Sequence, residues 1–374
     1  MGLGPKGRER LKRAALVLGA PLLMLLFLEG ASSWILFTPD FLRALHPQSQ
    51  SGQGLKARRD SLLGWVSEPN VHIQDMWGPG VDFRTNSLGF RGRNETTLQP
   101  PRGRLRILCS GDSFTMGEGV DDDQNWCALM AAKDSRLETV NLGQAGYGVD
   151  QAYLRYERDG HPLQPAVHVL AFITDDFRRM RSGSGKPKLE LQEGTLRVRN
   201  VPVRPTLSGY VVVRSLVQAA QQLRVVQFSQ RLVARTFGGS AETAPYDDTL
   251  AQVVSAILAD LSGMSQGDNT PLLLVYIPTL GEYLYPSSST DRWRERLRAE
   301  ADRMPNTWFL DLWSAFRRLP PDSATRLFIP YQGEQYQRRG FGHLSVLGNE
   351  WVADTLLGFL GRVPQIASQL DSLP

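Results

Sequence analysis

Residues 106–120, R-I-L-C-S-G-D-S-F-T-M-G-E-G-V, are the stretch that decides the fold. The apolar run 105–109 breaks at Ser110-Gly111-Asp112-Ser113, which predicts a buried strand, a tight turn and the start of a helix. Ser113 would then lie at the carboxyl end of the strand, where open parallel sheets bind ligands and where a helix N-terminus offers free N–H groups. This position suits a nucleophilic serine, although a plain Ser/Gly turn between a core strand and a helix fits the same residues.

Four more apolar stretches read as strands, and helical stretches alternate with them. The strands are expected at residues 137–141, 166–173, 271–278 and 307–312, and later helices at 208–236, 247–265 and 349–360. The 166–173 run is almost wholly apolar, as a parallel strand covered on both faces requires. Together the pattern predicts an α/β fold with a doubly wound, mostly parallel five-stranded sheet.

Three further words follow predicted strands or precede the last helix. N-L-G-Q-A-G-Y-G occupies residues 141–148, T-D-D-F occupies 174–177, and G-H-L-S-V-L-G occupies 342–348. The glycine spacing G-x-x-G-x-G, with no acidic residue closing a following strand, argues against a dinucleotide loop. A plain glycine turn is the alternative for residues 142–148.

Together these words resemble the four blocks of the SGNH (GDSL-type) hydrolases, a family of serine esterases, lipases, thioesterases and carbohydrate O-acyl hydrolases or transferases. The resemblance implies a flavodoxin-like three-layer fold. It also implies that Ser113 is the nucleophile, that His343 is its base, and that the N–H groups of Ser113 and Gly146 bind the oxyanion. D-x-x-L-G-W and T-N-x-x-G-F-R-G, within residues 60–92, resemble the segment before the first block in membrane-anchored bacterial members.

Two positions depart from the family pattern. The family has an acid two or three residues before the histidine, where this chain has Gly340 and Phe341; Glu334 is the nearest preceding acid and is either a surrogate or a solvated loop residue. Asp175 stands where the family has an oxyanion-binding asparagine. A carboxylate about 4 Å from an oxyanion repels it by roughly 4 kcal/mol at an effective dielectric of about 20.

An active enzyme must avoid that repulsion at Asp175. Either the carboxyl is protonated, which burial and the neighbouring Asp176 would favour, or it points away, towards His343, as a displaced triad acid.

The N-terminus predicts a membrane anchor. Residues 1–13 carry five basic residues and one acid, which equals the net charge of +4 of the whole chain, so the remainder sums to zero and no basic field for nucleic acid is left. Residues 14–37 are long and apolar enough for a single transmembrane helix, with the basic tail inside the inner (cytoplasmic) membrane and the bulk outside. A cleaved signal peptide ending near residues 31–33 and a buried soluble helix are the alternatives.

The rest of the chain divides around the predicted catalytic domain. Residues 38–100 read as a tether and an extension packed on that domain, 101–364 as the SGNH-like domain, 180–266 within it as an inserted hairpin and helices, and 365–374 as a tail. The long helices form either a cap or partner surface, or plain core helices. Asn86 and Gly89 are expected turn residues. Arg91 is a candidate substrate contact.

Composition limits the chemistry further. Cys109 and Cys127 are too few for a disulfide framework or a zinc site, and they read as two buried residues or as one disulfide. We expect no cofactor and no metal. The sequence leaves three readings: an ester hydrolase acting outside the membrane, with acylated glycans as its candidate substrates; an O-acyltransferase using the same Ser113 acyl-enzyme; and a non-catalytic binding protein of this fold.

Overall fold

The computed structural model describes residues 57–181, 185–204, 246–330 and 342–373, together with four separate positions near the N-terminus. All but those four belong to one compact unit, Gly52–Arg204 with Glu242–Pro374. The predicted anchor over 14–37, the alternative cleavage site at 31–33 and the predicted helix 208–236 lie outside the described ranges. None of the helices within those ranges combines the length and the hydropathy of a membrane span.

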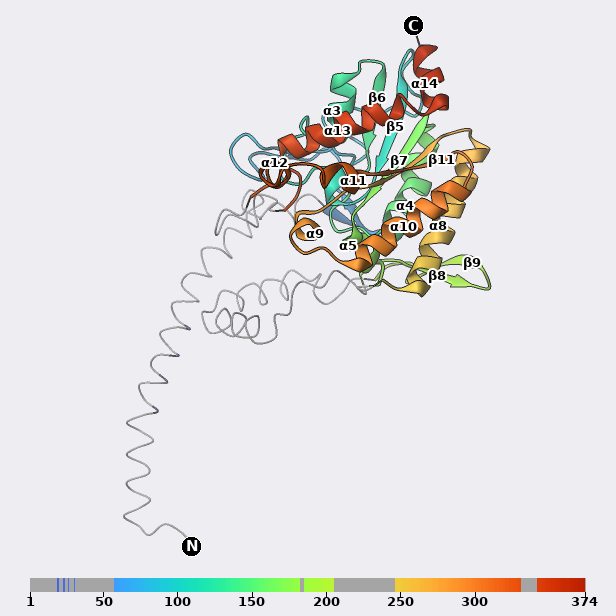
Figure 1. Ribbon diagram of the computed structural model, residues 1–374. Coiled ribbons are helices and arrows are strands. Elements are labelled where there is room, and N and C mark those ends of the chain that lie inside the picture. The colour runs from blue at the N-terminus through green and yellow to red at the C-terminus, as the bar shows by residue number, and fades with distance from the viewer. Residues whose placement is uncertain are drawn as a thin grey trace, which may run out of the picture. The chain divides into compact units, whose positions relative to one another are not determined.

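A parallel sheet of five strands forms the centre of the described unit (Figure 1). The strands are β5 Leu105–Ser110, β6 Leu137–Asn141, β7 Val167–Phe172, β10 Leu272–Tyr276 and β11 Thr307–Asp311. Their spatial order is β6-β5-β7-β10-β11, and every neighbouring pair is parallel. In chain order this is 2-1-3-4-5, the flavodoxin-like doubly wound arrangement, whose ligand site lies between the first and third strands. The predicted sheet is therefore confirmed, and its switch point lies between β5 and β7.

Helices cover both faces of the sheet, as right-handed crossovers require (Figure 1). One face carries α3 Trp126–Lys133 and α13 Val346–Leu360, which pack on each other. The other carries α4 Val149–Arg155, α8 Asp248–Gly267 and α10 Ser288–Arg303. The other described α-helices are α2 Ser113–Met116, α5 Thr174–Arg181, α9 Leu280–Leu284, α11 Leu312–Phe316, α12 Pro321–Arg326 and α14 Pro364–Asp371.

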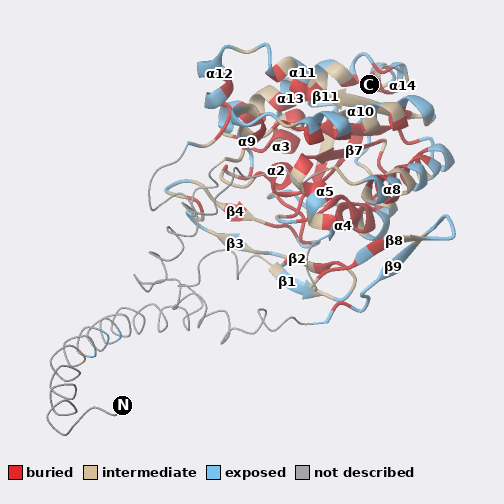
Figure 2. Cartoon of the chain, turned by 60° about the horizontal axis from the view of Figure 1, so that its bottom comes forward, coloured by how far each residue is buried: buried red, intermediate tan, exposed pale blue. Residues whose placement is uncertain are grey.

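The core lies between these layers (Figure 2). Every residue of β5, β7 and β10 is buried, which explains their nearly continuous apolar sequence. His168 is the polar exception in β7: its Nε2 lies 3.0 Å from Ser110 Oγ, and its ring stacks on Tyr156 with 3.5 Å between centroids. Burial lowers the pKa of His168 to about 3, so the imidazole is neutral.

The extension before β5 packs on the domain as short paired strands. They are β1 Ala57–Asp60 with β2 Gly64–Ser67, and β3 His72–Ile73 with β4 Phe83–Arg84. Asn86 and Gly89 do form a turn: Gly89 donates its N–H to Asn86 O at 3.0 Å and has a φ of +77°. Arg91 is 6% exposed and its guanidinium pairs with Asp122 at 3.1 Å, so its role in this structure is to join buried segments.

The predicted hairpin and the described long helix both belong to this domain. The hairpin is formed by β8 Lys188–Gln192 and β9 Thr195–Arg199, around Gly194 with a φ of +76°. Helix α8 buries one apolar face in the core, which supports the core-helix reading of residues 247–265. The segment expected as a tail, 365–374, contributes α14, whose Ile366 and Leu370 are buried.

Cys109 and Cys127 are both buried and both free thiols. Burial raises the pKa of Cys109, and a hydrogen bond with Cys127 raises it further. The structure supports the reading of Cys109 and Cys127 as two small buried residues.

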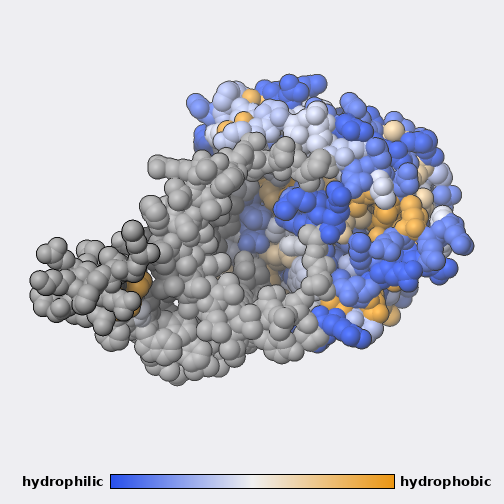
Figure 3. Space-filling model, turned by 90° about the horizontal axis from the view of Figure 1, so that it is seen from below, coloured by the Kyte–Doolittle hydropathy of each residue, from blue (hydrophilic) through white to orange (hydrophobic). Residues whose placement is uncertain are grey.

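In the surface view, the described residues are mostly hydrophilic, with smaller hydrophobic patches between them (Figure 3).

Asp150 carries a testable prediction about stability. Its side chain is fully buried in α4, and burial raises its pKa from 3.8 to about 6, against the opposing charge of Lys186. Because the folded pKa lies above the unfolded one, stability is lost as the pH rises through this range. Asp150→Asn should therefore raise the free energy of unfolding by about 2 kcal/mol at pH near 8 and leave it unchanged near pH 4. Urea unfolding at both pH values tests this, and equal gains at both would contradict it.

Candidate active site

Ser113 is the first residue of α2, directly after the carboxyl end of β5. Asp112 caps this short helix: its Oδ1 accepts the N–H of Phe114 at 2.8 Å. The Ser113 hydroxyl donates at 3.4 Å to Asp112 Oδ2, a weak contact. Ser113 therefore lies at the carboxyl end of β5, beside the switch point of the sheet, as the sequence predicts.

His343 reaches Ser113 from the other end of the chain. Its Nε2 lies 2.8 Å from Ser113 Oγ, and its ring packs on Phe114 with 4.8 Å between centroids. The backbone on either side is fixed, because His343 O accepts the N–H of Ile329 at 2.8 Å and Ser345 caps α13 by accepting the N–H of Gly348 at 3.2 Å. A base at hydrogen-bond distance from a serine hydroxyl is the arrangement that nucleophilic catalysis needs.

The loop 142–148 docks directly on the turn that carries Ser113. Gln144 donates its N–H to Gly111 O at 3.1 Å, and the Asn141 amide donates to Thr115 O at 2.8 Å. A Cβ on Gly143 would lie 2.2 Å from Met116 N, so only glycine fits there. Gly146 has a φ of +79°, which favours glycine, and is exposed on this loop.

The N-terminal extension holds this loop from its other side, a role that the sequence did not reveal. Trp65 donates its indole N–H to Ala145 O at 3.0 Å, and Tyr147 donates its hydroxyl to Trp65 O at 2.5 Å. Ser67 donates both its N–H and its hydroxyl to Gln144 Oε1 at 2.9 Å. The D-x-x-L-G-W word therefore supports the predicted oxyanion segment. No local sequence pattern indicates these contacts, because they join residues about 80 positions apart.

Asp175 does not have the environment that the sequence suggested. Its carboxylate binds Arg178 at 2.5 and 2.9 Å and Arg179 at 3.2 Å. Burial alone would raise its pKa, but these two guanidinium groups outweigh burial and lower the pKa below 3.8. The expectation of a protonated Asp175 is therefore wrong, and its oxygens face arginines instead of His343.

The raised pKa belongs to the next residue. Asp176 is 2% exposed, and burial together with the charge of Asp112 raises its pKa well above the ordinary value. Its Oδ2 accepts the N–H of Ile173 at 3.0 Å, and its Oδ1 accepts Arg179 Nη1 at 2.6 Å. Burial and a neighbouring negative charge do raise a carboxyl pKa here, as expected. The carboxyl concerned is that of buried Asp176 and not that of Asp175.

Glu334, the proposed surrogate acid, lies outside the described residues, as do Gly340 and Phe341. Its role stays a prediction. Within the described part of the chain, no group of three or more His, Cys, Asp or Glu side chains is arranged to hold a metal ion.

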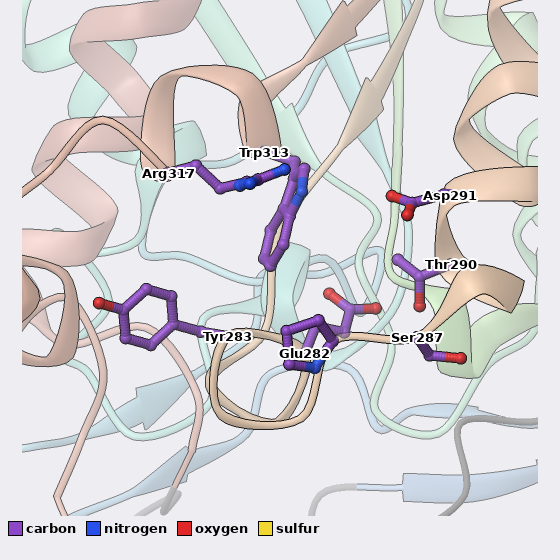
Figure 4. A pocket seen from close by; sticks show the side chains of 8 residues that line it. Glu282, Tyr283, Ser287, Thr290, Asp291, Trp313 and Arg317 are labelled. Carbon is purple, nitrogen blue, oxygen red and sulfur yellow. The ribbon is translucent and has the colours of Figure 1, made fainter.

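A separate small pocket of about 190 Å³ lies beyond the carboxyl ends of β10 and β11 (Figure 4). Its lining comes from Glu282, Tyr283, Pro286, Ser287, Thr290, Asp291, Trp313 and Arg317. Neither Ser113 nor His343 belongs to it. A hydrogen-bonded chain links its wall to the end of β7: Thr174 Oγ1 lies 2.7 Å from Tyr276 OH, which donates to Glu282 Oε1 at 2.6 Å.

The chain is similar to several solved structures. One is a structure of TesA, with 13% identity and a TM-score of 0.39, covering 70% of this chain and 99% of that one. A variant of an acetyl-xylooligosaccharide esterase from Geobacillus has 16% identity and a TM-score of 0.39, covering 68% and 93%. A member of the lipolytic protein G-D-S-L family from Veillonella parvula has 14% identity and a TM-score of 0.37, covering 69% and 100%.

No family model and no curated protein matches the sequence. Structural similarity this weak does not assign an activity, so we infer the function from the geometry around Ser113.

The ion pairs of Asp175 lead to a prediction. Asp175→Asn should change kcat/KM by no more than about fivefold, because it removes partly exposed ion pairs of small net energy. The pH profile between about pH 6 and pH 9 should keep its shape, since the carboxyl is already ionised there. Ester hydrolysis measured across that range tests both points. A loss beyond a hundredfold in a folded variant would instead mark Asp175 as a required carboxylate.

Proposed function

We propose that the chain is a serine-dependent ester hydrolase of the SGNH type. The observation that carries this proposal is the 2.8 Å contact between Ser113 Oγ and His343 Nε2, two residues 230 positions apart. Ser113 follows the carboxyl end of β5, where open α/β sheets bind ligands, and His343 places a base within hydrogen-bond reach of its hydroxyl, as nucleophilic catalysis needs.

The geometry supports acyl transfer in two steps. His343 Nε2 takes the Ser113 proton while Oγ attacks the ester carbonyl carbon, and the resulting oxyanion accepts the N–H groups of Ser113 and Gly146. His343 then gives the proton to the leaving alcohol, which departs as the C–O bond breaks. Water repeats the sequence on the acyl-enzyme: it gives a proton to His343, its oxygen bonds to the acyl carbon, and the acid leaves as Ser113 regains its proton.

Labelling and turnover of the same protein test this function. The full chain should react covalently with a fluorophosphonate at Ser113 and should hydrolyse short-chain p-nitrophenyl esters. Peptide mapping identifies the labelled residue. Absence of both reactions in folded protein would favour a binding protein of this fold, and release of the acyl group to added sugar alcohols faster than to water would favour the transferase.

The location and the substrate class are further parts of the proposal. The five basic residues among positions 1–13 and the apolar stretch 14–37 support a single-pass inner-membrane protein with its catalytic domain outside. The resemblance of the four blocks supports O-acylated glycans as substrates. Protease added to spheroplasts should digest the domain, and a soluble mature form beginning near Trp34 would contradict the anchor.

A further inference from the structure

Arg179 lies beneath the predicted active site, on α5. A single nitrogen of its guanidinium, Nη1, has three acceptors: Asp112 Oδ2 at 2.9 Å, Asp176 Oδ1 at 2.6 Å and Tyr147 O at 3.2 Å. These acceptors come from three segments distant in sequence: the turn before α2, the glycine loop and the start of α5. The Arg179 side chain is 21% exposed, against 1% for Asp112 and 3% for Asp176.

Two of the three acceptors are next to residues that the proposed chemistry uses. Asp112 precedes Ser113, and Tyr147 follows Gly146, whose N–H is the expected oxyanion donor. The main chain of Arg179 is also held, because Lys186 donates its ammonium to Arg179 O. A side chain whose planar guanidinium and whose own main-chain carbonyl are both hydrogen-bonded is a rigid connector between these segments.

The contact with Asp112 bears directly on the nucleophile. The Ser113 hydroxyl has one proton and two acceptors in reach, His343 Nε2 at 2.8 Å and Asp112 Oδ2 at 3.4 Å. For attack the proton must go to His343. Arg179 binds the same oxygen, Asp112 Oδ2, and its positive charge makes that oxygen a weaker competitor for the proton.

We propose that Arg179 is a positioning residue of the site: it binds Asp112 so that the Ser113 hydroxyl donates to His343, and it fixes the loop that presents Gly146. This inference rests on the proposed ester hydrolase activity. It also gives the departure at position 175 a reason, since Asp175 Oδ2 accepts Arg179 Nη2 at 3.2 Å and helps to orient the guanidinium.

Removing the charge of Arg179 should lower kcat more than it raises KM. In Arg179→Gln the hydroxyl turns towards Asp112, and misplacement of a reacting group by about 1 Å costs about a hundredfold in rate. The rate of fluorophosphonate labelling should fall by a similar factor. Arg181→Gln is the matched control: Arg181 lies on the same helix, is 54% exposed and pairs with Asp247, so both rates should stay unchanged.

The split between kcat and KM separates positioning from a purely structural role. A disturbed fold would weaken substrate binding as well as turnover, whereas a misdirected Ser113 hydroxyl lowers kcat and the labelling rate and leaves KM nearly unchanged.

Two companion variants keep the proposal falsifiable if Arg179→Gln is unstable. Arg179→Lys retains a cation with three hydrogen-bond donors. Its kcat should therefore reach at least about a tenth of the wild-type kcat. Arg179→Gln combined with Asp176→Asn replaces both partners of the buried Arg179–Asp176 contact with neutral amides, so its thermal stability should return to near the wild-type value. Its kcat should not return, because Asp112 still lacks its guanidinium partner.

The outcomes are distinct. Recovery of full activity in the double variant would show that Arg179 only balances Asp176 and would overturn the proposal. A wild-type kcat in folded Arg179→Gln would overturn it as well. If the wild-type protein itself neither hydrolyses esters nor reacts with the fluorophosphonate, the proposed function fails first, which is a different result from an active enzyme that tolerates loss of Arg179.

Discussion

Ser113→Ala should abolish fluorophosphonate labelling and lower ester hydrolysis by at least about ten-thousandfold. The expected loss is large because the substitution removes the atom that would form the acyl-enzyme, leaving only binding and the oxyanion donors. The fold should survive. Alanine removes one oxygen and no core volume, and Asp112 still caps α2 through the N–H of Phe114.

A second serine provides the control for this experiment. Ser110 lies three residues earlier, is also buried, and contacts His168 instead of His343. Ser110→Ala should therefore keep both labelling and hydrolysis. Intact mass measurement after labelling distinguishes the variants directly, and a label that persists in folded Ser113→Ala would show that the nucleophile has been assigned to the wrong residue.

The arrangement of the sheet could be predicted because each strand carries its own signal. Parallel strands covered on both faces must be apolar throughout, and turn residues mark where each one ends. The word around Ser113 therefore placed the serine at the ligand edge, and the glycine loop after β6 was placed beside it. The contact between Ser113 and His343 followed from the resemblance, because no local pattern links residues so far apart.

The environment of Asp175 was misjudged for a reason that the sequence does contain. In D-D-F-R-R, helical spacing puts Asp175 beside both Arg178 and Arg179 and puts Asp176 beside Arg179, as observed. These ion pairs are not apparent when the segment is taken only as the end of a strand, because they depend on the helix that begins there. Which carboxyl faces inward, by contrast, depends on how α5 packs against the turn before α2, and only tertiary structure decides that.

Trp65 and Gln144 show the other limit of the sequence. Their hydrogen bonds fix the loop that presents Gly146, but they join the N-terminal extension to a loop about 80 residues later. A tryptophan after a glycine reads equally well as core, as a surface aromatic or as a ligand contact. The physical requirement it meets, a donor for a loop carbonyl, exists only in the folded chain.

His343→Ala should lower kcat by roughly a hundredfold to ten-thousandfold, the usual contribution of a general base. The Ser113 hydroxyl loses its acceptor at 2.8 Å and can then give its proton only to Asp112, whose Oδ2 is weakened by Arg179. Added imidazole should restore part of the activity, because the substitution leaves a space beside Ser113 that is bordered by the Phe114 ring. Rescue distinguishes a missing base from a disturbed fold, since free imidazole supplies the proton acceptor and repairs no packing.

His161→Gln is the matched control, as His161 lies near the surface and pairs with Asp268. If His343→Ala keeps more than about a tenth of the activity, or if imidazole has no effect on a folded variant, another group must accept the Ser113 proton.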